Sequence, residues 1–369
     1  MIQFTRYLYI KDEVELSLFS SLLNKDEKES VFWASELYYS GLIPELIHLL
    51  WKIYYDLYAS LNHSFGKYLL SKLKPSITID ALHNVVGNFV IRPFNIDILL
   101  CKIMSETFDF EFDSSIENYW ENNDYLFLIC MILKDKNNEQ LLLLENSLQQ
   151  KGVCLSKEYK AFEKYSQQSG VDINIIKASF VLYNINKLYK NPIGKNLFIE
   201  LENIYDFSTI QCNLNNDPNS IYPLLPILPA RDILRTAHLM QIDKFKCLSL
   251  FDLKRDELSD KQLADTYWYH WEYYCYKTPY WNKIMKLYDV KLEKTKKKIR
   301  FLDDDEYEKQ EGFYNNYGLD TDELPLEISN KSIGKIQTQQ KWMDMYNKFK
   351  GTVEIDNEYI EDIIKYKYI

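Results

Sequence analysis

A dense group of aromatic side chains lies between residues 267 and 281, where nine of the fifteen residues are Tyr or Trp. Exposed rings of this kind could stack on RNA bases, as in many proteins that bind single strands. Rings placed all round a helix are more typical of a buried helix, because large aromatic surfaces are rarely left in water. We therefore expect core packing and keep base stacking as the alternative. The candidate residues for stacking are Trp268, Trp271, Tyr274 and Trp281.

A basic run follows the aromatic segment. Thr278 and Pro279 are typical of a helix start, and we expect the helix that begins there to extend to about Arg300. The C-terminus of a helix favours cations, so a solvated helix end is the simplest interpretation of the run. The alternative is a surface that binds RNA or an acidic partner. The basic residues are Lys294, Lys296, Lys297, Lys298 and Arg300.

Two of the six arginines, Arg231 and Arg235, are spaced one helical turn apart. A guanidinium pair of this kind could bind a phosphate or a carboxylate, because each group offers a planar fork of donors. Ion pairs with Asp232 or Asp243 would explain the same residues without a ligand. Arg231 and Arg235 therefore form a candidate anion site.

Motifs for catalysis and cofactor binding are absent from the sequence. It contains neither of the two glycine-rich phosphate loops, its five histidines never recur at metal-ligand spacing, and its six cysteines form no C-x-x-C pair. The acidic run 303–306 could attract Mg²⁺ or Ca²⁺, but ligands adjacent in the chain rarely converge on one ion. We expect no catalytic residues, no metal, no cofactor and reduced, buried thiols.

Composition favours helices. Only 10 of 369 residues are glycine, the residue that hairpins and bulges most need. The net charge is −10, whereas a dedicated duplex-DNA binder is usually basic, because the phosphate backbone supplies most of its affinity. No apolar run is long enough for a signal sequence or a bilayer span. We expect a protein without membrane segments, in the cytoplasm.

The elements that must position these side chains are predicted from apolar residues at helical spacing. We expect helices at 12–23, 26–40, 44–61, 64–73, 78–90, 94–106, 115–134, 139–150, 156–168 and 171–190. Further helices are expected at 230–239, in the aromatic segment, at 337–350 and at 359–366. The predicted fold class is all-α, an irregular helical solenoid or stacked helical hairpins of HEAT-like type.

Four prolines within twelve residues, from 218 to 229, predict a domain boundary, because proline blocks helix continuation. We expect an N-terminal helical domain at 1–206, a linker at 207–229 and a C-terminal helical domain at 230–369. Within the second domain, residues 301–334 combine acidic runs with three glycines and a proline. This composition predicts an irregular acidic arm.

Two stretches, FWASELYYSGLIPELIHLLWKIYYDLYA near the N-terminus and FYNNYGLDTDELPLEISNKSIG near the C-terminus, resemble a family of uncharacterised helical proteins of giant nucleocytoplasmic DNA viruses. The resemblance implies a viral source and the host cytoplasm or viral factory as location. It implies no active-site residues.

Three hypotheses about function follow. The first is a non-enzymatic scaffold or adaptor that binds other proteins, for example an RNA helicase or a cap-binding protein, as the HEAT-like middle domain of a translation-initiation scaffold does. The second is an RNA-binding protein that uses the aromatic cluster and the basic run. The third is an internal virion or assembly protein. The sequence leaves the oligomeric state open.

Overall fold

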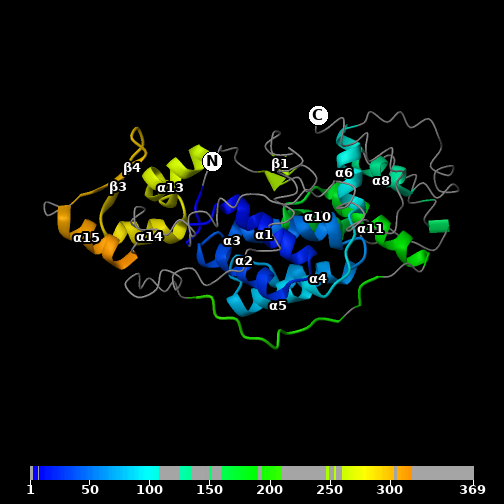
Figure 1. The fold of residues 1–369 in the computed structure, drawn as a ribbon. Coiled ribbons are helices and arrows are strands. Elements are labelled where there is room, and N and C mark those ends of the chain that lie inside the picture. The colour runs from blue at the N-terminus through cyan, green and yellow to red at the C-terminus, as the bar shows by residue number, and fades with distance from the viewer. Residues whose placement is uncertain are drawn as a thin grey trace. The chain divides into compact units, whose positions relative to one another are not determined.

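The computed structural model describes residues 3–107, 125–134, 159–189, 193–208, 260–302 and 306–317, except Tyr7, Asn196 and some side chains, together with the backbone at residues 146, 149, 150, 247, 248, 253 and 254. The described residues are mostly helical, with two small two-stranded sheets (Figure 1). The predicted predominance of helix is therefore confirmed. Contacts divide the chain into two compact units, residues 1–46 with 200–339 and residues 47–199 with 340–369.

The first unit begins with a pair of helices, α1 (Lys11–Leu23) and α2 (Glu27–Tyr39), which pack against each other. The side chain of Asp26 caps α2 by accepting a hydrogen bond from the backbone N–H of Glu29 at 3.0 Å. Gly41 follows the helix with a φ of +79°, a conformation that favours glycine. The predicted first helix and both predicted ends of the second helix are confirmed.

The aromatic segment forms two helices, α13 (Asp260–Cys275) and α14 (Pro279–Leu287), with Thr278 and Pro279 at the start of α14 as predicted. The prediction that α14 extends to about Arg300 is wrong. After Leu287 the chain forms an antiparallel hairpin of β3 (Val290–Glu293) and β4 (Lys298–Phe301). A further helix, α15 (Glu306–Tyr317), occupies part of the expected irregular arm. A second small sheet pairs β1 (Cys247–Leu248) with β2 (Leu253–Lys254).

One apolar cluster of the first unit joins the N-terminal segment, α13, α14, the β3–β4 hairpin and α15. Trp271 of α13 and Trp281 of α14 are each about 1% exposed, and their rings meet edge to face at 5.9 Å. Phe313 of α15 stacks on Trp271 at 6.3 Å. The remaining members are Phe4, Leu8, Ile10, Cys275, Ile284, Met285, Val290 and Phe301. The expectation that the aromatic segment packs in a core is confirmed for Trp271 and Trp281.

The second unit contains a succession of short helices. Helix α3 (Ile43–Ile53) runs on into a π-helical turn, η1 (Tyr54–Tyr58), and is followed by α4 (His63–Lys72) and α5 (Ile79–Val90). Next come α6 (Asp97–Thr107), α8 (Tyr125–Lys134), α10 (Tyr159–Ser169) and α11 (Ile173–Leu188). Helix α8 packs against both α6 and α11, and α11 also packs against α10. These positions agree with the helices predicted from periodicity.

An extended segment in the second unit is fixed by side chains of α5. The amide of Asn88 donates to the carbonyl of Ile199 at 2.7 Å and accepts from its N–H at 3.1 Å. Arg92, just past the end of α5, donates to the carbonyl of Leu197 at 2.6 Å, and its guanidinium lies 4.3 Å from the Phe65 ring centre. Burial lowers the pKa of Arg92 to about 10. The backbone of this segment is thus hydrogen-bonded by buried side chains and not by a neighbouring strand.

Several predicted features lie outside the described residues. These are the first part of the helix at 115–134, most of the helix at 139–150, the linker from 209 to 229, the helices at 230–239, 337–350 and 359–366, and the acidic arm at 303–305 and beyond 317. The cysteines that the structure describes with their side chains, Cys101, Cys130 and Cys275, form no disulfide and are buried, as expected. Within the described part of the chain, no helix is long and apolar enough to span a membrane.

Candidate nucleic-acid interface

The candidate stacking residues whose side chains the structure describes are largely removed from solvent, as the expected core packing requires. Trp271 and Trp281 are buried in the core, and Tyr274 is partly buried against the same cluster. Trp268 lies in α13, and its side chain is outside the described part of the structure. The Trp271 and Trp281 rings therefore serve packing and are not accessible to a base.

The five predicted basic residues lie together, but on the β3–β4 hairpin and not at a helix end. Lys294, Lys296 and Lys297 form its turn, while Lys298 and Arg300 belong to β4. The helix-dipole explanation of this run is therefore wrong. All five residues are exposed.

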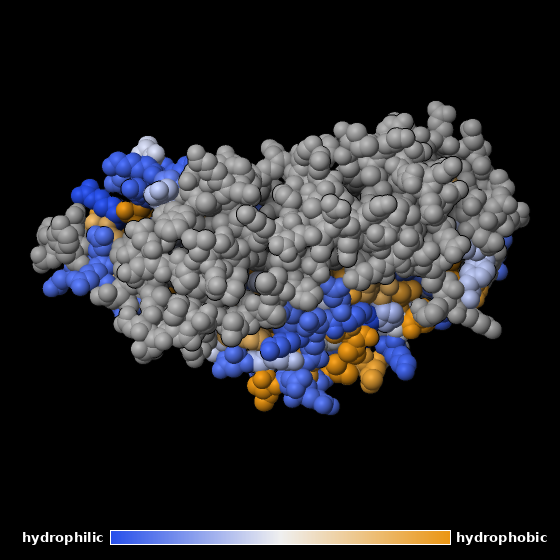
Figure 2. Space-filling view, viewed as in Figure 1, coloured by the Kyte–Doolittle hydropathy of each residue, from blue (hydrophilic) through white to orange (hydrophobic). Residues whose placement is uncertain are grey.

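The hairpin has one apolar and one polar face, because residues directly opposite each other on antiparallel strands share a face. Val290 opposes Phe301 and Leu292 opposes Ile299, and this face joins the core. On the other face Lys291 opposes Arg300, and Glu293 opposes Lys298. Most of the coloured surface at the hairpin is hydrophilic in Figure 2, with a smaller hydrophobic area beside it. The fold thus turns the basic residues outward.

Charge on the hairpin is strongly one-sided. Residues 290–301 contain six basic residues and one acidic residue, a net charge of +5. The whole chain carries −10, so the remainder carries −15. The acidic residue, Glu293, forms an ion pair with Lys296 at 3.1 Å, and the Lys296 side chain is 71% exposed. The hairpin is therefore a local cationic surface on an acidic protein.

Two neighbouring residues of α13 were not predicted as site residues. Tyr269 is 66% exposed, and Nδ1 of His270 lies 3.0 Å from the backbone oxygen of Lys297 in the hairpin turn. Because a carbonyl only accepts, Nδ1–H of the imidazole is the donor. At 100° per residue Tyr269 lies about 200° round the helix from Trp271, so the two side chains are on different faces, but the sequence does not show which of the two faces is buried.

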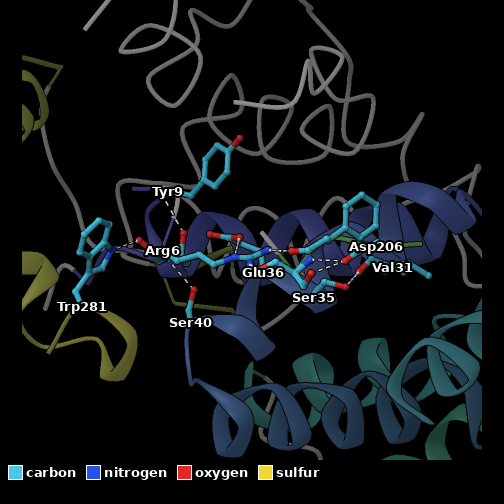
Figure 3. A network of polar contacts seen from close by, with 11 residues as sticks. Arg6, Tyr9, Val31, Ser35, Glu36, Ser40, Asp206 and Trp281 are labelled. Atoms are coloured by element: carbon cyan, nitrogen blue, oxygen red, sulfur yellow. Dashed lines mark hydrogen bonds and ion pairs between the residues drawn. The ribbon is translucent and has the colours of Figure 1, made fainter. Parts of the chain in front are cut away.

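The candidate anion site at Arg231 and Arg235 lies outside the described residues. A different arginine, Arg6, is the centre of a buried polar network in the first unit (Figure 3). Its Nε donates to Glu36 at 2.9 Å, and its two Nη atoms donate to the carbonyls of Phe207 and Ser208. All groups of this network satisfy one another, which is typical of a structural role.

A small hollow in the second unit lies beside the π-helical turn, a type of irregularity that often marks functional sites. Its enclosed space measures about 20 Å³, which is enough for one water molecule. Burial raises the pKa of the Tyr54 and Tyr55 hydroxyls that line it, so both stay protonated. The described residues contain no group of three His, Cys, Asp or Glu that could hold a metal ion. The hollow is too small for a cofactor.

The described fold and surface define a mostly helical protein with an exposed cationic β-hairpin. No family model matches the sequence, and comparisons with curated proteins and with solved structures found no match. The resemblance to helical proteins of giant viruses therefore stays a prediction.

Proposed function

We propose that the protein binds RNA through the phosphate backbone, using the basic face of the β3–β4 hairpin. The observation that supports this most directly is the exposure of six cationic side chains within one twelve-residue hairpin whose other face is anchored in the core. Lysine and arginine that neutralise phosphates release counterions, and this release supplies most of the affinity of sequence-independent binding. The proposed activity is binding, without catalysis.

The negative charge of the rest of the chain supports an RNA contact that is limited to the hairpin. A net charge of −15 outside the hairpin repels a polyanion, so the proposed contact is confined to the hairpin end of the first unit. A local contact of this size suits RNA better than a duplex-DNA reader, which usually combines several positive elements across the grooves.

Lysines on an exposed hairpin have a second physical explanation. Charged side chains on edge strands prevent pairing with other chains and so prevent aggregation. Under that explanation, neutral substitutions would change solubility and leave RNA affinity unchanged. Under our proposal, affinity changes while the protein stays monodisperse.

The test is binding of a short fluorescent RNA, followed by anisotropy at low salt. The test variant carries Lys294→Gln, Lys296→Gln and Lys298→Gln, and leaves Lys297 in place because its φ is +51°. We expect its affinity to fall on the order of tenfold or more. The control carries the same change at three exposed helix lysines of the second unit, Lys72, Lys160 and Lys164. Equal affinities for both variants would contradict the proposal.

The scaffold hypothesis is a second proposal, supported by the stacked helices α6, α8, α11 and α10, for which we propose a HEAT-like arrangement. Its predicted contact surface at 301–334 lies largely outside the described residues. If the hairpin serves an acidic protein partner, the glutamine variant will lose that partner while its RNA affinity stays unchanged. The same measurement therefore separates the two functions.

A further inference from the structure

Tyr269 is unusual among the aromatic residues of its segment. Its side chain is 66% exposed, whereas Trp271, two residues later on the same helix, is 1% exposed. A Tyr ring exposed to this extent is accessible to a ligand, and its flat apolar faces suit stacking. Its one described ring contact is with His270, whose ring centre lies 6.4 Å away with the two planes at 61°. The ring therefore has a face available for stacking.

The hairpin turn is fixed next to this ring. The hydrogen bond from His270 to the Lys297 carbonyl, 3.0 Å long, ties the turn to the helix one residue from Tyr269. Helix α13 also packs directly against β4. An exposed ring and the ammonium groups of the turn thus share one edge of the first unit, and both belong to elements that are anchored in its core.

We infer that this edge is a binding site for single-stranded RNA, in which one base stacks on Tyr269 while the adjoining phosphates contact the lysines of the turn. This inference rests on the proposed RNA binding and adds the form of the RNA. Single strands offer unstacked base faces, whereas the bases of a duplex are stacked on one another and unavailable to a side chain. Base–aromatic stacking tolerates any sequence, as expected for a site without base-specific donors.

The test compares Tyr269→Ala and Tyr269→Phe for binding to a single-stranded RNA and to the same sequence as a duplex. We expect the alanine variant to lose about tenfold in affinity for the single strand, because one stacked base is removed. Its salt dependence should match that of the native protein, since the phosphate contacts remain. The phenylalanine variant should bind as the native protein does. Leu287→Ala, which truncates a 72% exposed side chain of α14, is the matched surface control.

Three outcomes would overturn the inference in distinguishable ways. Unchanged single-strand affinity in Tyr269→Ala, with the lysine dependence intact, would remove the stacking site and leave RNA binding standing. Absence of RNA binding by the native protein at low salt would remove both. Preference of the native protein for the duplex would also contradict the single-strand site, because a duplex offers no base face to the ring.

Discussion

Lys291 and Arg300 lie directly opposite each other on β3 and β4, and both side chains are exposed. Like charges at opposite positions of an antiparallel pair are destabilising. A polyanion on this face would offset the repulsion, because its phosphates are negatively charged. In our proposal, the repulsion that destabilises the free hairpin is therefore relieved when RNA binds.

Replacement of Lys291 by Glu separates these two properties. The new carboxylate faces Arg300, and an opposite-charge pair at this position contributes about 0.2–1 kcal/mol. We expect a small rise in the midpoint of thermal unfolding together with weaker RNA binding. Lys164→Glu, on exposed α10, makes the same charge change elsewhere and should leave RNA affinity nearly unchanged. Equal losses of affinity in the two variants would point to net charge and not to the hairpin.

The hydrogen bond between His270 and the hairpin turn predicts that substitutions of His270 and Tyr269 have non-additive effects on RNA affinity. His270→Ala removes the hydrogen bond to Lys297, so the lysines are no longer fixed beside the ring. We expect it to weaken RNA binding in the native background and to have a smaller effect in the Tyr269→Ala background. The measurement is a double-mutant cycle of affinities. Strict additivity would mean that His270 does not position the site.

Buried and exposed aromatic residues of the same segment should contribute very differently to the free energy of unfolding. Trp281 is buried, and its Nε1–H donates to the carbonyl of Thr5 at 3.1 Å. Trp281→Ala should reduce the free energy of unfolding by about 3–5 kcal/mol, because it leaves a large cavity and removes one of the two hydrogen bonds that the Thr5 carbonyl accepts, the other coming from the Leu8 N–H. Tyr269→Ala should change it by less than about 0.5 kcal/mol. Chemical denaturation of both variants measures the difference.

The buried ion pair of Arg6 and Glu36 predicts a large loss of stability when one partner is removed. Both side chains are about 1% exposed or less, so removing one partner leaves a buried charge uncompensated. We expect Arg6→Met to lower the free energy of unfolding by about 3–5 kcal/mol. Because Arg6 also binds the carbonyls of Phe207 and Ser208, the variant should be cleaved faster near these residues in limited proteolysis. Unchanged cleavage would show that this segment is held by other contacts.

Asp97 predicts a pH dependence of stability. Burial raises its pKa to about 7, and its Oδ2 atom has no hydrogen-bond partner among the described residues. The unfolded chain releases this proton near pH 4, whereas the folded protein keeps it to about pH 7. Folding therefore retains a proton in this window, and this contribution to stability falls as pH rises through it. The stability of Asp97→Asn relative to the native protein, measured by urea denaturation, should therefore rise as pH increases from about 4 to about 7 and level off above that; a constant difference across this range would contradict the assignment.

Helix positions could be predicted from sequence because their apolar residues recur with the helical period, as in α1 and α5. The hairpin was missed because its turn, Lys294 to Lys297, contains none of the residues that usually mark a tight turn. Lys297 adopts a φ of +51° without being glycine. The alternation of apolar and charged residues in β3 and β4 was the available signal, but each strand has only four residues.

The candidate site was predicted in part. The basic residues were identified from composition, since charge remains on the surface whatever the backbone conformation. The stacking residue was not, because density of aromatic residues alone does not distinguish Trp271 from Tyr269. Their difference depends on which face of α13 meets α14 and α15, a packing that involves Phe313, more than thirty residues along the chain. The contacts of Arg6 with residues near 207 left no pattern in the sequence.

The most direct test of RNA binding by the hairpin is the salt dependence of the dissociation constant. For single strands the logarithmic slope is about 0.7 per phosphate contact. Substitution of Lys294, Lys296 and Lys298 by Gln should therefore reduce the slope by about 2, whereas substitution of Lys72, Lys160 and Lys164 should leave it unchanged. An unaltered slope in the hairpin variant would contradict the proposal that these lysines bind the RNA backbone.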